Sequence, residues 1–237
     1  MDVDELLQRY ARGDRAFDRV KLQECELLGT DFGRSSFERA DFRQARLGRS
    51  HFPHSNFREA DLSEAILWGT DFTDADLYGA LLRDADLSGA HLVGVRLERA
   101  NLIKAILSGA DFSRAVLERA LLIEADLRST ADQRTTLREA NLREADLSYA
   151  HLNEAILEGA NLEGAKLCRA NLSSEAGTDA LPTDLSNANL RGADLSYADF
   201  SGAILRNANL RDADLTRTVF DRADLTGAIL PDGRVAE

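Results

Sequence analysis

A period of five residues runs through almost the whole chain and limits what it can fold into. Every fifth residue is Leu or Phe over 17–127, the same phase resumes over 137–172, and a shifted phase runs over 185–230. All 10 Phe residues of the chain occupy this position. A short, regular internal repeat of this kind is typical of solenoid proteins, in which each repeat packs mainly against its neighbours.

We call the Leu or Phe the centre of each quintet. The residue two positions before a centre is nearly always small, as at Ala60 and Ala100, and the residue between them is often Asp or Asn. Because a period of five fits neither the helical period of 3.6 nor the strand period of 2, we expect the chain to turn a corner every five residues. Four sides then close one coil, and coils stack about 4.8 Å apart through parallel backbone hydrogen bonds. The pattern predicts an all-β solenoid, a quadrilateral parallel β-helix.

The ends and two interruptions divide the predicted rod. Residues 1–14 are expected to form a capping segment with a short α-helix at 2–12, because Val3, Leu6, Leu7 and Tyr10 lie on one helical face behind an Asp2 N-cap. The β-helix should then occupy 15–230, with a tail at 231–237 that begins in a Pro-Asp-Gly turn. Polar, turn-rich stretches near 128–136 and 173–184 interrupt the repeat, and we expect both to loop out.

Composition and charge exclude several classes of function. The chain carries 41 acidic and 29 basic residues, a net charge of −12, which argues against direct binding of nucleic acid. No apolar run approaches the roughly 20 residues of a membrane span, and the acidic start MDVDELLQRY differs from a signal peptide. Two cysteines far apart in sequence suggest neither a disulfide framework nor a metal cluster. We expect a cytoplasmic protein without membrane contact.

The sequence offers no catalytic, metal-binding or cofactor-binding constellation, so we expect a non-enzymatic protein without a cofactor. With coils of about 20 residues, one surface column is predicted to contain Asp31, His51, Asp71, His91, Asp111 and, further on, His151, with His54 on the same wall. Its histidines lie too far apart to share a metal ion. We interpret the column as alternating charge that relieves repulsion between stacked carboxylates.

Exposed apolar residues are the remaining candidate for function. Outward positions of the quintets should be polar, yet seven of them between residues 62 and 127 are large and apolar. Contiguous apolar surface marks protein interaction sites, and Trp is a favoured anchor. The candidate partner-binding surface consists of Ile66, Trp68, Leu81, Ile103, Ile106, Leu121 and Ile123.

The quintets resemble the pentapeptide-repeat family, whose A(D/N)LXX consensus occurs as ADLSE at 60–64, ANLIK at 100–104 and ADLTG at 223–227. The resemblance covers about residues 15–230 and implies that the β-helix is right-handed. The segments ANLIKA at 100–105 and GAKLCRAN at 164–171 are also similar to one cyanobacterial member of the family. That similarity implies a regulator of heterocyst differentiation that acts by protein contact, with the transcription factor HetR as its partner.

A different function is known within the same family. Some pentapeptide-repeat proteins mimic DNA and modulate DNA gyrase, and the acidic charge and predicted rod shape favour this alternative. Arginines such as Arg119, Arg138 and Arg143 are interleaved with the acidic residues, which weakens any DNA-like field. The polar ending after Leu230 also differs from the apolar C-terminal end through which those proteins pair.

Overall fold

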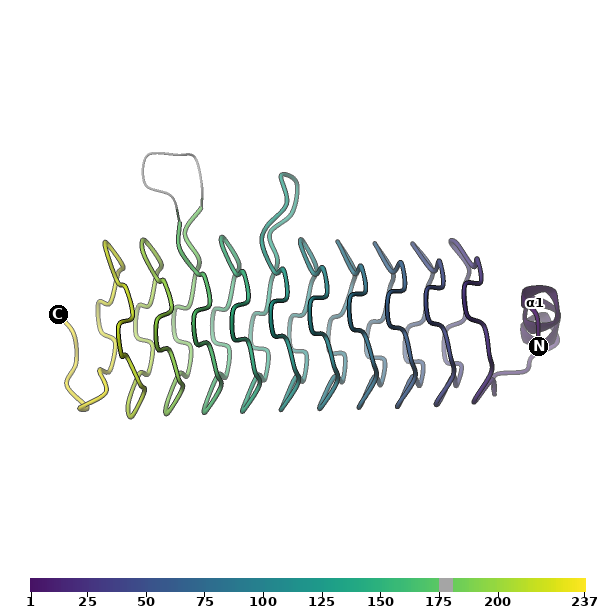
Figure 1. Ribbon diagram of the computed structural model, residues 1–237, viewed down its shortest axis with the longest axis horizontal. Helices are drawn as coiled ribbons and strands as arrows, with labels where there is room; N and C mark the ends of the chain where they lie inside the picture. The colour runs from purple at the N-terminus through teal and green to yellow at the C-terminus, as the bar shows by residue number, and fades with distance from the viewer. Residues whose placement is uncertain (175–180) are drawn as a thin grey trace.

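Parallel bridges join residues one coil apart in the computed structural model, which describes residues 1–174 and 181–237. Asp61 pairs with Leu81, and Leu81 pairs in turn with Asn101, each 20 residues further along the chain. Each bridge is a single residue long, so the described chain consists of isolated bridges and turns rather than extended strands. The coils stack into a rod with one helix at its N-terminal end (Figure 1).

Each coil has four sides, which we call walls A, B, C and D in chain order. In one coil their centres are Leu77, Leu82, Leu87 and Leu92, all fully buried. The small residues two positions before the centres are also buried, so each wall turns two side chains inward and three outward. Since Leu or Ala repeats at equivalent places, the interior is a set of stacked columns of matched volume.

The corners between walls are tight turns with a left-handed residue. Two positions after the centre, Glu64 has a φ of 58° and Lys104 a φ of 60°, and the same holds along most of the rod. The amide of Ala65 donates to the carbonyl of Leu62 at 3.1 Å and closes a turn of type II. Charged side chains or glycine occupy most of these corners, because the position points into solvent and requires a positive φ.

Phenyl rings fill the N-terminal coils. On wall D the rings of Phe32 and Phe52 stack with centroids 5.9 Å apart, and those of Phe52 and Phe72 stack at 5.5 Å. Rings on wall A meet them edge to face, as for Phe52 and Phe57 at 5.1 Å. Further along the rod, Leu takes over most of the centres, so the two halves of the core differ in chemistry.

Both interruptions fall at the corner between walls C and D. Asp111 pairs with Thr136, 25 residues on, so residues 128–135 project as the loop seen in Figure 1. Ile156 pairs with Asp184, 28 residues on; part of the predicted interruption at 173–184 lies outside the described residues. A threonine stands where the chain returns to each wall. The Thr135 hydroxyl accepts a hydrogen bond from the Gly109 backbone amide at 2.7 Å. The Thr183 hydroxyl accepts one from the Glu154 backbone amide at 3.0 Å.

The N-terminal end of the rod is covered by helix α1 (Val3–Ala11), close to the expected 2–12. The Asp2 carboxylate accepts from the Glu5 amide at 2.8 Å and caps the helix. Leu6 is completely buried against the first coil, and the Tyr10 ring lies edge-on to Phe32 at 4.9 Å. The helix therefore shields the first ring layer from water.

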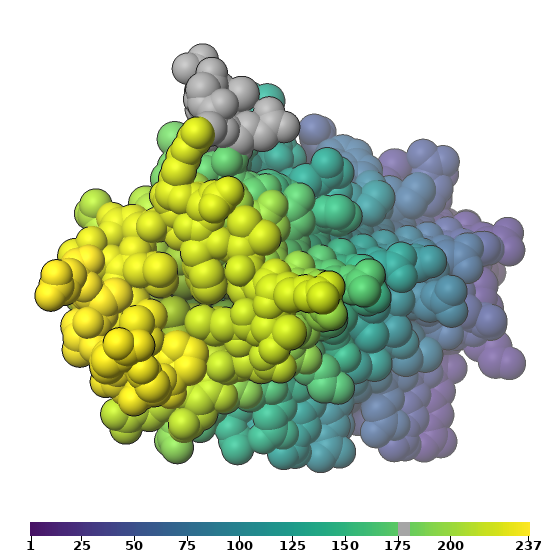
Figure 2. Space-filling view, turned by 60° about the vertical axis from the view of Figure 1, so that its left-hand side comes forward, coloured from purple at the N-terminus to yellow at the C-terminus, as the bar shows by residue number. Residues whose placement is uncertain are grey.

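The C-terminal tail folds back on the last coil, which the sequence did not predict. Ile229 and Val235 form an antiparallel bridge, and the Ala236 amide donates to the Ala228 carbonyl at 2.8 Å. Figure 2 shows this end, with the yellow tail along one side of it. The last centres, including Phe220 and Leu225, are only half-buried, so the tail covers this end less completely than α1 covers the other.

Candidate functional site

Three of the seven predicted partner-binding residues lie on wall C. Ile66 and Trp68 flank the same centre, and Ile106 lies two coils further on with Asp86 between them. All three are exposed. The Trp68 ring lies against Gly48, where an added Cβ would come within 2.8 Å of it, and the Arg49 guanidinium lies over the ring, 4.6 Å from its centre. The indole of Trp68 is thus held by two contacts and remains partly exposed.

The other four residues lie on wall B, which adjoins wall C. Leu81 and Leu121 are exposed and share a column with Asn101 between them. Ile103 and Ile123 are neighbours in the column that follows the centres of wall B, because the Lys104 amide donates to the Ile123 carbonyl at 3.0 Å. Both side chains are half-buried. Leu121 and Ile123 flank the centre Leu122, and Ile103 follows the centre Leu102 one coil earlier. The apolar surface on wall B is therefore concentrated on these two coils.

A charged corner separates the two apolar areas. Between walls B and C the corner positions are Asp84, Lys104 and Glu124, and the Lys104 ammonium lies 3.6 Å from the Glu124 carboxylate. The predicted surface is therefore two apolar strips on either side of a charged ridge. Counting along the quintets gives the wall of each residue. The charged ridge is recognised only when the corner residues are compared with the apolar residues of walls B and C on either side of them.

The predicted histidine column needs correction. His51 and His91 do share wall D, and each pairs with Asp71, whose carboxylate lies 3.8 Å from the His51 imidazole. His151 lies on wall C instead, bridged to Asp126 and Asn171. The loop at 128–135 adds five residues to one coil, which shifts the residues between the two interruptions by one wall relative to a strict spacing of 20.

Sequence reasoning missed several exposed apolar residues. Leu28 lies in the same column as Trp68, two coils before it, and Val219 lies on wall C near the C-terminal end. Tyr149 and Tyr197 occupy corner positions, where arginines also occur. The tyrosines follow the interruption at 128–136, outside the span in which the apolar surface was sought.

Ion pairs between successive coils organise much of the remaining surface. The Arg39 guanidinium donates to the Glu59 carboxylate at 2.7 Å, and this hydrogen bond lowers the pKa of Glu59. Arg119 and Glu144 form an equivalent pair at 2.6 Å, which lowers the pKa of Glu144. These pairs are fully exposed, so each contributes little to stability, but together they neutralise much of the acidic surface.

Arg134 holds the loop at 128–135 against the next coil. Its guanidinium donates at 2.7 Å both to the Glu154 carbonyl and to the Pro182 carbonyl. Burial lowers the pKa of Arg134, because the charged group gives up water and the nearby carboxylates of Asp184 and Glu154 offset only part of that loss. The two interruptions are thereby tied together at one corner of the rod.

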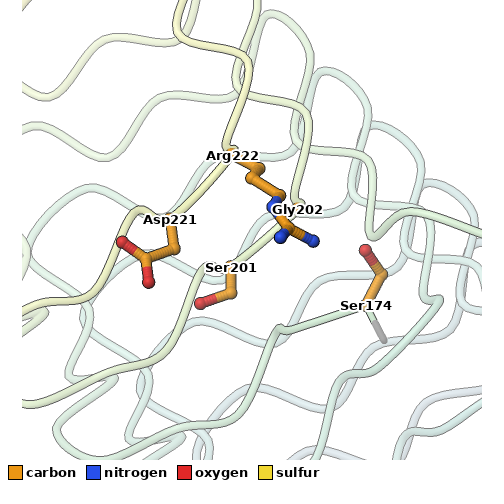
Figure 3. A pocket seen from close by; sticks show the side chains of 5 residues that line it. All are labelled: Ser174, Ser201, Gly202, Asp221 and Arg222. Atoms are coloured by element: carbon orange, nitrogen blue, oxygen red, sulfur yellow. The ribbon is translucent and has the colours of Figure 1, made fainter. Parts of the chain in front are cut away.

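An open cleft of about 640 Å³ lies near the C-terminal end, lined by Ser174, Ser201, Gly202, Asp221 and Arg222. Figure 3 shows Arg222 reaching across Gly202 toward Ser174, with Asp221 beyond Ser201. These groups can hydrogen-bond a polar ligand, but the lining has no imidazole to activate a serine. Among residues 1–174 and 181–237, no group of three or more His, Cys, Asp or Glu side chains is placed to hold a metal ion.

No helix in the described chain is both long and apolar enough to cross a membrane. Of the two cysteines, Cys25 is half-buried beside the core, and burial raises the pKa of its thiol to about 11. It therefore stays protonated near neutral pH and is a poor nucleophile.

Two family models, both described as pentapeptide repeats, match the chain. One matches residues 17–66, and the other matches successive segments at 55–92, 80–119, 107–131, 136–173, 183–222 and 193–232. No curated protein sequence gives a significant match.

Solved structures give further likenesses. The structure of HetL from the cyanobacterium Nostoc sp. strain PCC 7120, a pentapeptide repeat protein involved in heterocyst differentiation regulation, is 55% identical, with 100% of both chains covered and a TM-score of 0.98. QnrB1, a plasmid-mediated fluoroquinolone resistance protein, is 20% identical over 88% of this chain and 90% of its own, with a TM-score of 0.41. A pentapeptide repeat protein of the Arabidopsis thaliana thylakoid lumen is 30% identical over 55% of this chain and 68% of its own, with a TM-score of 0.24.

Proposed function

The chain belongs to the pentapeptide-repeat family, and on that premise we propose that it regulates heterocyst differentiation as a HetL-like protein. The observation that carries this proposal is the 55% identity to HetL over the full length of both chains, with a TM-score of 0.98. Neither the family match nor the likeness to HetL gives an indication of enzymatic activity. A rod of this kind acts through its outer surface, because its interior is filled by Leu, Phe and Ala.

We infer that the partner is the transcription factor HetR, bound through the apolar strips of walls B and C. Trp68 supports this surface, since an indole already in contact with Gly48 and Arg49 loses little freedom when a partner covers it. Ile66 and Ile106 extend the strip on wall C, and both are exposed. The Asp84–Lys104–Glu124 ridge between the strips would give polar contacts that set the orientation of the partner.

The finer description of the rod is also part of this proposal. We infer a right-handed, four-sided parallel β-helix over 15–230, preceded by a capping segment at 1–14 and followed by a tail at 231–237. Successive bridges 20 residues apart and a turn every five residues support the four-sided coil. We place the protein in the cytoplasm, where a transcription factor is available as a partner.

Binding to purified HetR tests the proposed surface. The double variant Trp68→Ser and Ile106→Asn replaces each residue by one that its own column already contains, at Ser88 and Asn171. We expect binding to weaken by about 30-fold or more, since a central anchor contributes about 2 kcal/mol or more.

The matched control is Val219→Asn, in the same column as Ile106 and equally exposed, at 41% against 43%. This variant should bind HetR like the unaltered protein. Equal affinity of the double variant and the control would reject the apolar strips as the binding surface. Failure of the unaltered protein to bind HetR would reject the partner itself.

Modulation of DNA gyrase is the second candidate, and the net charge of −12 on a rod favours it. The coil-to-coil pairs of Arg39 with Glu59 and Arg119 with Glu144 count against it, because they break the acidic surface into neutralised segments. A supercoiling assay separates the candidates. Inhibition of gyrase at low protein concentration would favour DNA mimicry over the regulator.

A further inference from the structure

One corner of the rod, between walls B and C, carries an ordered column of polar and aromatic side chains. Each residue of this column donates its amide to the coil that holds the next one, which sets their order across both interruptions. All of them are exposed. Along the rod, this corner column begins with Glu24, Gln44 and Glu64 and continues with Asp84, Lys104, Glu124, Tyr149, Arg169, Tyr197 and Arg217. We call the last seven of these residues the B/C ridge.

The C-terminal half of the B/C ridge is a ladder of alternating tyrosine and arginine. The Arg169 guanidinium lies 5.7 Å from the Tyr149 ring centre and 5.3 Å from that of Tyr197, and Arg217 lies 5.5 Å from Tyr197. The two tyrosines remain 47% and 45% exposed. Tyrosine and arginine are the residues that protein interfaces enrich, so the ladder is suited to contact with another protein.

The B/C ridge is complementary to itself when its direction is reversed. We propose that two copies of the chain associate side by side and antiparallel along this ridge, with Tyr149 on the two-fold axis. Arg169 of one copy then faces Glu124 of the second copy, which forms an ion pair. One coil further from the axis, Tyr197 faces Lys104, a cation–π pair.

The outermost pair of the seven places Arg217 opposite Asp84, again with opposite charges. No position of the ridge meets a like charge in this register. Because both copies have the same spacing of about 4.8 Å per coil, one correct pair brings all the others into register. A partner with a different spacing would match only one or two positions, which favours a second copy.

The columns beside the ridge allow the close approach. The two-fold axis places wall B beside wall B, so Ile123 faces Cys168 and Ile103 faces Ser196, and both facing residues are small and uncharged. On wall C, His151 meets its counterpart at the axis, and Ile106 faces Asp199. These columns contain no opposed pair of carboxylates in this arrangement.

The contact is long and narrow, so the dimer is expected to be weak. Seven coils span about 30 Å, and a contact one ridge wide falls in the class of small interfaces below about 1,200 Å². Exposed ion pairs are screened by salt, so association should fall as ionic strength rises. This inference concerns self-association and does not depend on the identity of the regulated partner. Asp84, Lys104 and Glu124 belong to both proposed surfaces, so a partner bound there and a second copy would exclude each other.

Cysteine trapping tests the position of the axis. In a Cys168→Ser background, which removes the half-buried native thiol of wall B, Tyr149→Cys places two thiols face to face across the axis. Tyr197→Cys is the matched control, at the same kind of corner but opposite Lys104. Under mild oxidation at high protein concentration, we expect the Tyr149→Cys protein to form covalent dimers at least tenfold faster than the Tyr197→Cys protein. Equal rates, or no dimer from either, would overturn the proposal.

Charge reversal gives a second, independent test in the Tyr149→Cys protein. Arg169→Glu should slow dimer formation at least tenfold, because it then faces Glu124, and adding Glu124→Arg should restore the rate. Arg99→Glu, an arginine at a corner of another wall, should leave the rate unchanged. If Arg169→Glu weakened HetR binding while self-crosslinking stayed the same, the B/C ridge would be a partner surface and the dimer would be rejected.

Discussion

The phenyl rings of the N-terminal coils should stabilise the rod beyond their buried area, and Phe52→Leu measures this. Phe52 has four ring partners, with centroids 5.1–5.9 Å away. Each aromatic pair contributes about 0.5–1.5 kcal/mol beyond burial, so four pairs at the low end give about 2 kcal/mol. In a chain of this length that corresponds to a loss of about 4–8 °C in Tm.

Phe112→Leu is the matched control for this prediction. Phe112 is also completely buried, but its column neighbours are Leu92 and Leu137 rather than aromatic residues. Both variants lose the same atoms from a buried centre, so the terms for transfer and cavity formation are common to the two. The difference between them therefore isolates the ring contacts.

Thermal unfolding followed by circular dichroism gives the two Tm values, and amide hydrogen exchange shows which coils lose protection. We expect Phe52→Leu to lower protection mainly in coils 30–75, because repeat proteins transmit a perturbation chiefly to neighbouring repeats. Equal losses of Tm for the two variants would refute the role assigned to the rings.

Three further outcomes follow from single side chains. At pH 8 a thiol reagent should modify Cys168 rapidly and Cys25 about 100-fold more slowly than an ordinary thiol, because the pKa of Cys25 is raised to about 11; two equally fast thiols would contradict its burial. Gly48→Ala should displace the ring of Trp68, the single tryptophan, and increase acrylamide quenching of its fluorescence with little change in Tm. The pKa of Asp224 is lowered to about 2 by hydrogen bonds from Thr226 and then from Arg206, so its contribution to stability is present above pH 3.8 and is lost as pH falls toward 2; an NMR titration midpoint near 3.8 would show that these hydrogen bonds are absent in solution.

The sequence carries enough information to predict the coil, because the period acts on the core directly. A Leu or Phe at each centre and an Ala two positions earlier must point inward together, and only a corner every five residues allows this. The capping helix is predictable for the same kind of reason, since Asp2 is a favoured N-cap residue and Leu6 and Tyr10 lie on one apolar face. The return of the tail, with Val235 paired to Ile229, has no such local signal and depends on the edge of the last coil.

Surface columns were predictable only up to the first loop. The wall of Ile66 or Leu121 follows from counting, whereas His151 was placed on the wrong wall because the loop at 128–135 lengthens one coil by five residues. Asp132 stands where a Leu or Phe would fill the core, which marks this quintet as a loop, but a strict spacing of 20 counts it as one side of a coil and so misplaces His151. The order Glu124, Tyr149, Arg169 and Tyr197 in the B/C ridge is hidden in the sequence for the same reason.

The uniform spacing of the coils makes the rod a molecular ruler. Because one coil of about 20 residues is interchangeable with the next, gaining or losing a whole coil changes the length by about 4.8 Å while the core keeps the same cross-section. The distance along the rod between Trp68 on wall C and the tyrosines of the B/C ridge can therefore change only in steps of one coil. Evolution is free to tune how far apart two docked proteins sit without redesigning either docking surface.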